Sequence, residues 1–206
     1  MWWQDHLSEF VTLFLVINPF GSLPIFMALT ASLNGPERRQ VALTATLVAL
    51  ALLVFFVVGG NLLLRWIGIS IRAFQIAGGI VLFLVALDMI QGRISASADA
   101  REGSHQALAI YPLAFPLIAG PGSFITVIFL TDDDRYNFWG QSVTVGVITS
   151  VLAIQFAILL AATAISRAIG SAGVSVIGRI MGMLLAATAV GMVLTAIGQW
   201  LNLPVL

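Results

Sequence analysis

The sequence contains no cysteine and no lysine, and it is poor in charge of either sign. Only 9% of its 206 residues are charged, and the formal net charge is zero. The lack of cysteine excludes disulfides, thiol nucleophiles and cysteine-ligated metals. The lack of a basic cluster argues against a nucleic-acid partner. We therefore expect no catalytic residue, no metal site and no cofactor.

Hydrophobic residues make up 60% of the chain. A spanning helix needs about 20 mainly apolar residues, and the charged residues are spaced so that six such stretches remain. This predicts an all-α, polytopic membrane protein with a single transmembrane domain over residues 1–206. The first stretch lacks the basic leader of a signal peptide, so we expect it to be retained as a helix. The expected spans are 7–31, 41–64, 70–90, 108–130, 138–166 and 174–201.

The basic residues, all arginine, predict the orientation. With six spans, six of the nine arginines fall on one side of the membrane and three on the other. Because basic residues mark the cytoplasmic face, both termini are expected outside, in a cell (inner) membrane. All five tryptophans map to the outer side of the six-span arrangement, which supports the number of spans because tryptophan favours interfaces; aromatic belts form at both interfaces, so the orientation rests on the arginines. The inner set is Arg38, Arg39, Arg93, Arg101, Arg167 and Arg179; the tryptophans are Trp2, Trp3, Trp66, Trp139 and Trp200.

Two of the expected spans are interrupted at their centres by proline and glycine. Proline lacks the amide hydrogen that a helix needs, and glycine lets the backbone leave helical geometry. Irregular backbone at this depth is tolerated only where it packs in protein or lines a cavity. We therefore expect the first and fourth spans to be discontinuous. The two breaks are Asn18-Pro19-Phe20-Gly21-Ser22-Leu23-Pro24 and Ala119-Gly120-Pro121-Gly122-Ser123.

The second half of the chain aligns with the first at an offset of about 101 to 103 residues. This offset superposes the two breaks and pairs Gly79 with Gly182. It also pairs Ala86 with Ala189 and Met89 with Met192. Three spans per half make the second copy enter from the opposite side, so we predict an inverted repeat. Repeat one covers about 1–94, a linker about 95–106, and repeat two about 107–206.

Six short segments together resemble the MarC family of multi-pass inner-membrane proteins, over nearly the whole chain. The resemblance implies transport of small neutral amino acids such as glycine and alanine, which some members are described as carrying. One departure is Gly191, where a glutamine is expected in many relatives. The segments are Asn18-Pro19-Phe20-Gly21, Gly68-Ile69-Ser70-Ile71, Ile76-Ala77-Gly78-Gly79-Ile80, Pro112-Leu113-Ala114-Phe115-Pro116, Ala119-Gly120-Pro121-Gly122 and Arg179-Ile180-Met181-Gly182.

The breaks suggest a site for a zwitterion. A half-helix N-terminus offers amide hydrogens to a carboxylate, and a C-terminus offers carbonyls to an ammonium group or a cation. No charged side chain is expected near the centre of a span, which favours cargo without net charge. The coupling ion, proton or sodium, is open, and a homo-oligomer is one alternative for the assembly. The predicted substrate-binding residues are Asn18, Pro19, Gly21, Ser22, Ala119, Gly120, Pro121, Gly122 and Ser123.

Other polar or helix-breaking residues are expected to play supporting roles. Thr44 and Gln155 lie inside spans, where such side chains more often bond a neighbouring helix than a ligand. Pro112 and Pro116 are expected to shape the half-helix without touching the ligand. Alternatives to amino acid transport are an exporter of drugs or other small metabolites and a non-transport membrane protein. A hydrolase using Ser123 lacks a nearby base, and no nucleotide-binding motif is present, so we do not expect an enzyme.

Overall fold

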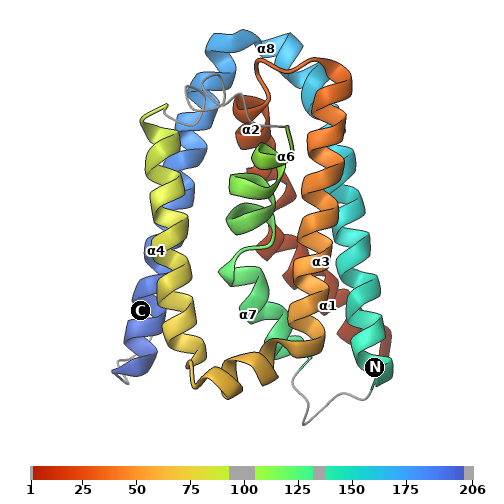
Figure 1. Ribbon diagram of the computed structural model, residues 1–206, viewed down its shortest axis with the longest axis vertical. Coiled ribbons are helices and arrows are strands. Elements are labelled where there is room, and N and C mark those ends of the chain that lie inside the picture. Colours follow the sequence, from red (N-terminus) through yellow and green to blue (C-terminus); the bar gives the residue numbers. More distant parts are fainter. Residues whose placement is uncertain (1, 93–104, 132–137, 202–206) are drawn as a thin grey trace.

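The computed structural model describes residues 2–92, 105–131 and 138–201, and this part of the chain is helical, without strands. Figure 1 shows long helices packed side by side, with the two termini at the same end of the molecule. In chain order the elements are α1 (Trp2–Ile17), α2 (Pro19–Leu29), α3 (Gly35–Ile67), α4 (Ile71–Ile90), α6 (His105–Leu108), the π-helical segment η1 (Ala109–Ile118), α7 (Pro121–Leu130) and α8 (Phe138–Trp200).

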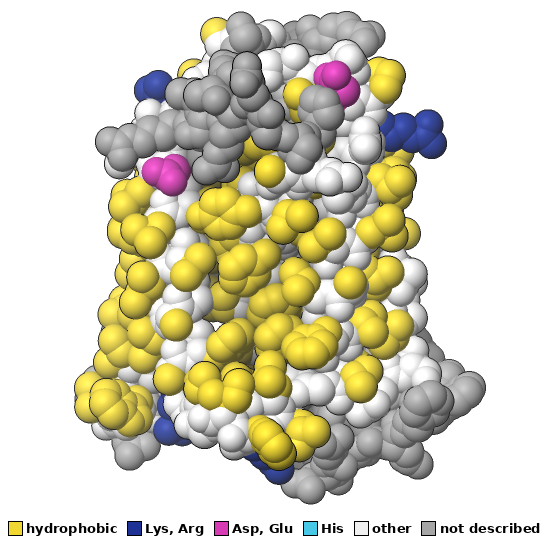
Figure 2. Space-filling model, in the orientation of Figure 1, with side chains coloured by type: hydrophobic (Ala, Val, Ile, Leu, Met, Phe, Trp, Pro, Cys, Tyr) yellow, Lys and Arg dark blue, Asp and Glu magenta, His cyan; other side chains and the backbone are white. Residues whose placement is uncertain are grey.

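The predicted membrane fold is confirmed. Five helical stretches of the described residues are long and apolar enough to span a membrane, and a sixth forms if the bent pair Gln106–Ile118 and Pro121–Leu130 is one span. Hydrophobic side chains cover the middle of the face in Figure 2, and the charged side chains lie toward its two ends. The five are His6–Leu29, Gly35–Ile67, Ile71–Ile90, Gly140–Ala162 and Ser175–Trp200.

Local signals in the sequence explain where these helices begin and end. Asn34 and Glu37 form a capping box at the start of α3, each side chain accepting a hydrogen bond from the other's backbone amide, at 3.0 and 2.8 Å. Gly68 ends α3 in the left-handed conformation, and the Ser70 hydroxyl accepts from the Ala73 amide at the start of α4. The short connections after α2 and α3 make α3 run antiparallel to the first span and α4 run antiparallel to α3 (Figure 1).

The fifth and sixth predicted spans are joined without a loop. Both belong to α8, whose backbone is interrupted by Gly170 at φ 69° and ψ 174°. A positive φ of this size is costly for any residue with a Cβ, so glycine permits the bend here. As a result the C-terminal half of α8 returns beside α4 and runs antiparallel to it (Figure 1).

Glycines let α4 and the C-terminal half of α8 approach closely. A Cβ at Gly79 would lie 3.0 Å from the Ala189 carbonyl oxygen, and a Cβ at Gly182 would lie 3.2 Å from the Ala86 carbonyl oxygen. The same pattern continues with Met192 beside Gly79 and Met89 beside Gly182. The residues that surround Gly79 on α8 are therefore the counterparts, at the offset found in the sequence, of those that surround Gly182 on α4.

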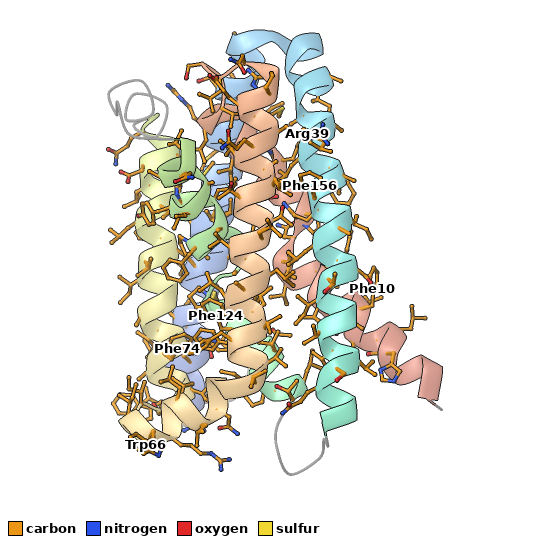
Figure 3. All side chains as sticks on the ribbon, turned by 45° about the vertical axis from the view of Figure 1, so that its right-hand side comes forward. Phe10, Arg39, Trp66, Phe74, Phe124 and Phe156 are labelled. Atoms are coloured by element: carbon orange, nitrogen blue, oxygen red, sulfur yellow. The ribbon has the colours of Figure 1, made fainter. Side chains whose placement is uncertain are left out.

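The two ends of the bundle carry arginines and tryptophans used to predict the membrane arrangement. Arg39 and Trp66 lie at opposite ends in Figure 3. Trp66 lies in the last turn of α3 and Trp200 ends α8, and both side chains are strongly exposed. The side chains of the other three tryptophans are not among those that the structure describes. Which end faces the cytoplasm stays a prediction.

Candidate functional site

The first break is a capped turn between α1 and α2. Asn18 adopts the left-handed conformation (φ 51°, ψ 66°), and its side-chain oxygen accepts from the Gly21 amide at 3.1 Å. A Cβ at Gly21 would lie 2.2 Å from the Asn18 side-chain nitrogen, so only glycine leaves room for this cap. The Ser22 hydroxyl donates to the Pro19 carbonyl at 2.9 Å. The sequence Asn-Pro-Phe-Gly-Ser therefore encodes the break locally.

The second break separates η1 from α7 and is bent more sharply, by 54°. The Ala119 amide closes η1 on the Ala114 carbonyl at 2.8 Å. Gly120 is extended, and a Cβ there would lie 2.1 Å from the Pro116 carbonyl oxygen. The Ser123 hydroxyl donates to the Ile118 carbonyl across the break at 3.1 Å. Both breaks thus have a serine whose hydroxyl hydrogen is taken up by a backbone carbonyl.

The two breaks line one cavity of about 530 Å³. They also come close directly, because a Cβ at Gly122 would lie 3.6 Å from Val16 in the last turn of α1. Residues of α4 and α8 complete the wall, among them Gln75, Thr188 and Met192. No charged and no aromatic side chain lines the cavity within the described part of the chain.

Most of the predicted binding residues lie on the cavity wall, and two do not. The wall includes Asn18, Gly21, Ser22, Gly120, Pro121, Gly122 and Ser123. Pro19 and Ala119 are buried behind it, and Thr44 does not reach it. Pro116, expected to shape the half-helix only, is part of the wall. Gln155 contacts the site through Ser22 without lining the cavity.

The two breaks differ in the backbone groups that they leave unsatisfied. The first backbone hydrogen bond of α7 runs from the Phe124 amide to the Gly120 carbonyl at 2.9 Å, so the Gly122 and Ser123 amides have no helical acceptor. No side chain caps this end. At α2 the Ser22 amide likewise donates to the Asn18 carbonyl, but the Asn18 side chain also accepts from the Gly21 amide, the counterpart of the Ser123 amide. The stronger donor end, carrying the positive end of the helix dipole, is therefore at α7.

Acceptors come from the helices that end at the breaks. Pro19 has no amide hydrogen for the Leu15 carbonyl four residues earlier, and Pro121 has none for the Leu117 carbonyl. Leu15 and Leu117, which carry these two carbonyls, both line the cavity. Donors and acceptors of backbone origin thus occur at one site that holds no formal charge, as suits a small zwitterion.

Three polar residues of the wall are absent from the sequence prediction. The Gln75 amide donates to the Met192 carbonyl at 3.1 Å and ties α4 to α8. Thr126 and Thr188 each donate to a carbonyl of their own helix. Gln75 is a lone amide inside an apolar span, the same signal that singled out Gln155. Nothing in the sequence distinguishes the two threonines from others that satisfy themselves locally.

The departure at Gly191 lies away from the cavity. Gly191 is exposed, and a Cβ there would meet nothing within 4 Å. It is absent from the cavity wall. The substitution therefore leaves the wall unchanged.

A separate polar pair lies in the first turns of α1. Glu9 is only 9% exposed, and one of its carboxylate oxygens lies 3.4 Å from Nδ1 of His6. Neither residue lines the cavity. The described residues of the cavity wall therefore include no titratable side chain.

This architecture defines a polytopic helical membrane protein with a mainly apolar cavity between two broken helices, whose described wall carries a few polar groups and no charged side chain. Comparison with known proteins identifies its relatives: the family model described as MarC family integral membrane protein matches residues 3–201. The chain therefore belongs to the MarC family.

Relatives cover almost the entire chain. The membrane protein MJ1677 of Methanocaldococcus jannaschii is 37% identical over 198 residues, which is 94% of this chain and 96% of the relative. YvbG of Bacillus subtilis is 33% identical over 190 residues, 89% and 90% of the two chains. The inner membrane protein YhgN of Escherichia coli is 32% identical over 201 residues, 97% and 99%. No solved structure matches the chain.

Proposed function

We propose that this protein is a secondary transporter that moves small neutral amino acids, with glycine and alanine as reference cargo, across the inner membrane. The observation that carries the proposal is the single cavity shared by both helix breaks, with no charged side chain among the described residues of its wall. Discontinuous helices meeting in one cavity mark the binding sites of many transporters. A cavity without fixed charge favours cargo without net charge, since a lone ion there would be poorly compensated.

The cargo carboxylate would bind at the N-terminus of α7, where the Gly122 and Ser123 amides and the helix dipole favour negative charge. The ammonium group would face the first break, where carbonyl groups and the side-chain oxygens of Asn18 and Ser22 accept hydrogen bonds. This arrangement binds the amino acid itself without a cofactor.

Alternating access requires two halves that move against each other. We propose that residues of about 1–94 and 107–206 are inverted repeats joined by a linker of about 95–106. Reciprocal contacts at the crossing of α4 and α8 support this, since Gly79 meets Ala189 and Gly182 meets Ala86 at one offset. The distribution of arginines places both termini outside in this proposal, and a proton or a sodium ion is the candidate coupling ion.

Two observations bear on the alternatives. The Ser123 hydroxyl donates to the Ile118 carbonyl and not to a base, which argues against a hydrolase. The cavity volume lies within the range of about 300 to 1,000 Å³ typical of sites for drug-sized ligands, so a larger metabolite is the second candidate cargo. The absence of aromatic side chains from the described wall favours the smaller, polar cargo.

Counterflow tests the proposal. Purified protein in liposomes preloaded with unlabelled glycine or alanine should accumulate labelled substrate, and protein-free liposomes should not. A panel of other small amino acids and a panel of apolar drugs separates the two candidate cargoes. Absence of protein-dependent counterflow for every small amino acid would contradict the leading proposal, and uptake of drugs alone would favour the second.

A further inference from the structure

Gln155 is an amide buried completely in the N-terminal half of α8. Its exposed fraction is 0%, and its Nε2 donates to the Ser22 hydroxyl across the interface between α8 and α2. Its Oε1 is also buried and has no hydrogen-bond partner among the described residues. A polar side chain inside a membrane domain is costly and is commonly functional. The contact that Gln155 makes is with a residue of the cavity wall.

The hydrogen bonds of the Ser22 hydroxyl determine what it offers to the cavity. A serine hydroxyl has one hydrogen and two lone pairs. The hydrogen is donated to the Pro19 carbonyl at 2.9 Å, and one lone pair accepts from Gln155. The second lone pair remains, and Ser22 lines the cavity. If the amide is turned so that its oxygen faces Ser22, the hydroxyl hydrogen still has an acceptor inside the protein. In both cases Ser22 presents an acceptor to the ligand.

We propose that Gln155 is a specificity-determining positioning residue, which holds the Ser22 hydroxyl as a hydrogen-bond acceptor toward the cavity. This inference rests on the proposed function and fixes the orientation of the cargo. The ammonium end lies at Ser22 in the first break, and the carboxylate lies at the Gly122 and Ser123 amides in the second. The site then selects amino acids whose nitrogen carries hydrogens directed at Ser22.

The N-methyl series of glycine tests this selection on the purified protein. Glycine, N-methylglycine, N,N-dimethylglycine and N,N,N-trimethylglycine keep the zwitterion while N–H donors are removed one by one. Wild-type affinity should fall along the series, by about tenfold or more for the trimethyl compound, because the last donor is lost. Ser22→Ala and Gln155→Leu should each reduce this ratio several-fold toward one.

A double mutant isolates the route through Ser22 from the bulk of the methyl groups. If Gln155 acts through Ser22, Gln155→Leu added to Ser22→Ala changes the ratio no further. Thr46→Val is the matched control, because Thr46 is buried and donates only within α3, to the Ala42 carbonyl. It should leave the ratio unchanged. Gln155→Asn, which keeps an amide but shortens it by one methylene, should behave like Gln155→Leu and covers the case in which the leucine variant does not fold.

The outcomes separate the two proposals. No binding of any member by the wild type contradicts the proposed function. Glycine binding with a ratio that Gln155→Leu and Gln155→Asn leave intact overturns the role of Gln155 while the transporter proposal stands. A wild type that binds the whole series equally overturns the orientation.

Discussion

Asn18 illustrates how a single residue defines the first break. It combines a left-handed backbone with a side chain that caps α2, and Gly21 is needed because any Cβ would collide with that side chain. Asparagine tolerates this backbone better than most residues with a Cβ. Proline at the next position suits the start of α2, because the amide of the first helical residue has no acceptor within the helix. Asn18, Pro19 and Gly21 thus all favour the same local structure.

Substitutions of Asn18 should separate its two roles. Asn18→Gly keeps the backbone conformation but loses the cap, and changing such a cap to glycine should cost only a few tenths of a kcal/mol. Asn18→Leu loses both, so about 1–2 kcal/mol of left-handed strain is added and glycine binding should be abolished. Thermal unfolding in detergent and equilibrium binding measure the two effects. Equal stability of the two variants would contradict the left-handed conformation at position 18.

Gly122 provides the second test at the scale of a residue. A Cβ there would be 3.6 Å from Val16 and 3.9 Å from Met192, which is ordinary contact. Gly122→Ala should therefore fold with stability within about 1 kcal/mol of wild type. Gly122→Leu should still insert but fill the cavity beside the α7 amides, and its affinity for glycine should fall at least tenfold. Binding assays on correctly folded protein check this; unchanged affinity in Gly122→Leu would move the site elsewhere.

The crossing of α4 with α8 shows how elements are held at close distance. At Gly79 and Gly182 the lack of a side chain lets each helix approach the backbone of the other. Small residues at the contact are typical of tightly packed membrane helices. The contacts are reciprocal, so substitutions on either helix should have similar effects.

Alanine substitutions test this reciprocity. Gly79→Ala and Gly182→Ala should each destabilise the protein by about 1–3 kcal/mol through overpacking. Gly191→Ala on the same helix α8 is the control, because a Cβ there meets nothing within 4 Å. It should be neutral or stabilising, by up to about 1 kcal/mol of helix propensity. Thermal unfolding of the three variants measures the difference, and a stable Gly182→Ala beside a destabilised Gly79→Ala would argue against the repeat.

The elements were largely predictable, because their signals are local. Apolar length predicted the spans, and the missing amide hydrogens of Pro19 and Pro121 predicted both breaks. The expected 70–90 agrees closely with α4 at Ile71–Ile90. The bend at Gly170 joins two spans without a loop. It could not be predicted, because the sequence alone does not give the backbone angles at this glycine. The hydrogen bonds of Gln75 and Gln155 join residues more than a hundred positions apart, so only tertiary structure reveals them.

At the scale of the whole molecule, orientation can be tested directly because the chain has no cysteine. Single cysteines can be introduced without a background of native thiols. Arg39→Cys and Trp66→Cys lie at opposite ends of the bundle (Figure 3). A membrane-impermeant thiol reagent applied to intact cells should label Trp66→Cys, whereas Arg39→Cys should require permeabilisation. The reverse pattern would invert the predicted topology, and labelling of both from outside would contradict a six-span arrangement.

A carrier differs from a channel because its cavity opens to one side at a time. Thr126 lines the cavity, and its hydroxyl donates only to the Gly122 carbonyl of its own helix, so Thr126→Cys should fold and bind. We expect the reaction of this thiol with an impermeant reagent to change in rate when glycine is added, with opposite changes on the two faces of proteoliposomes. A ligand shifts the equilibrium between two conformations only if it binds one of them more tightly than the other. Thr46→Cys, buried in α3 away from the cavity, should remain unlabelled as a control. Simultaneous labelling from both faces at rates that ignore glycine would indicate an open pore, and alternating access between the two broken helices would then be wrong.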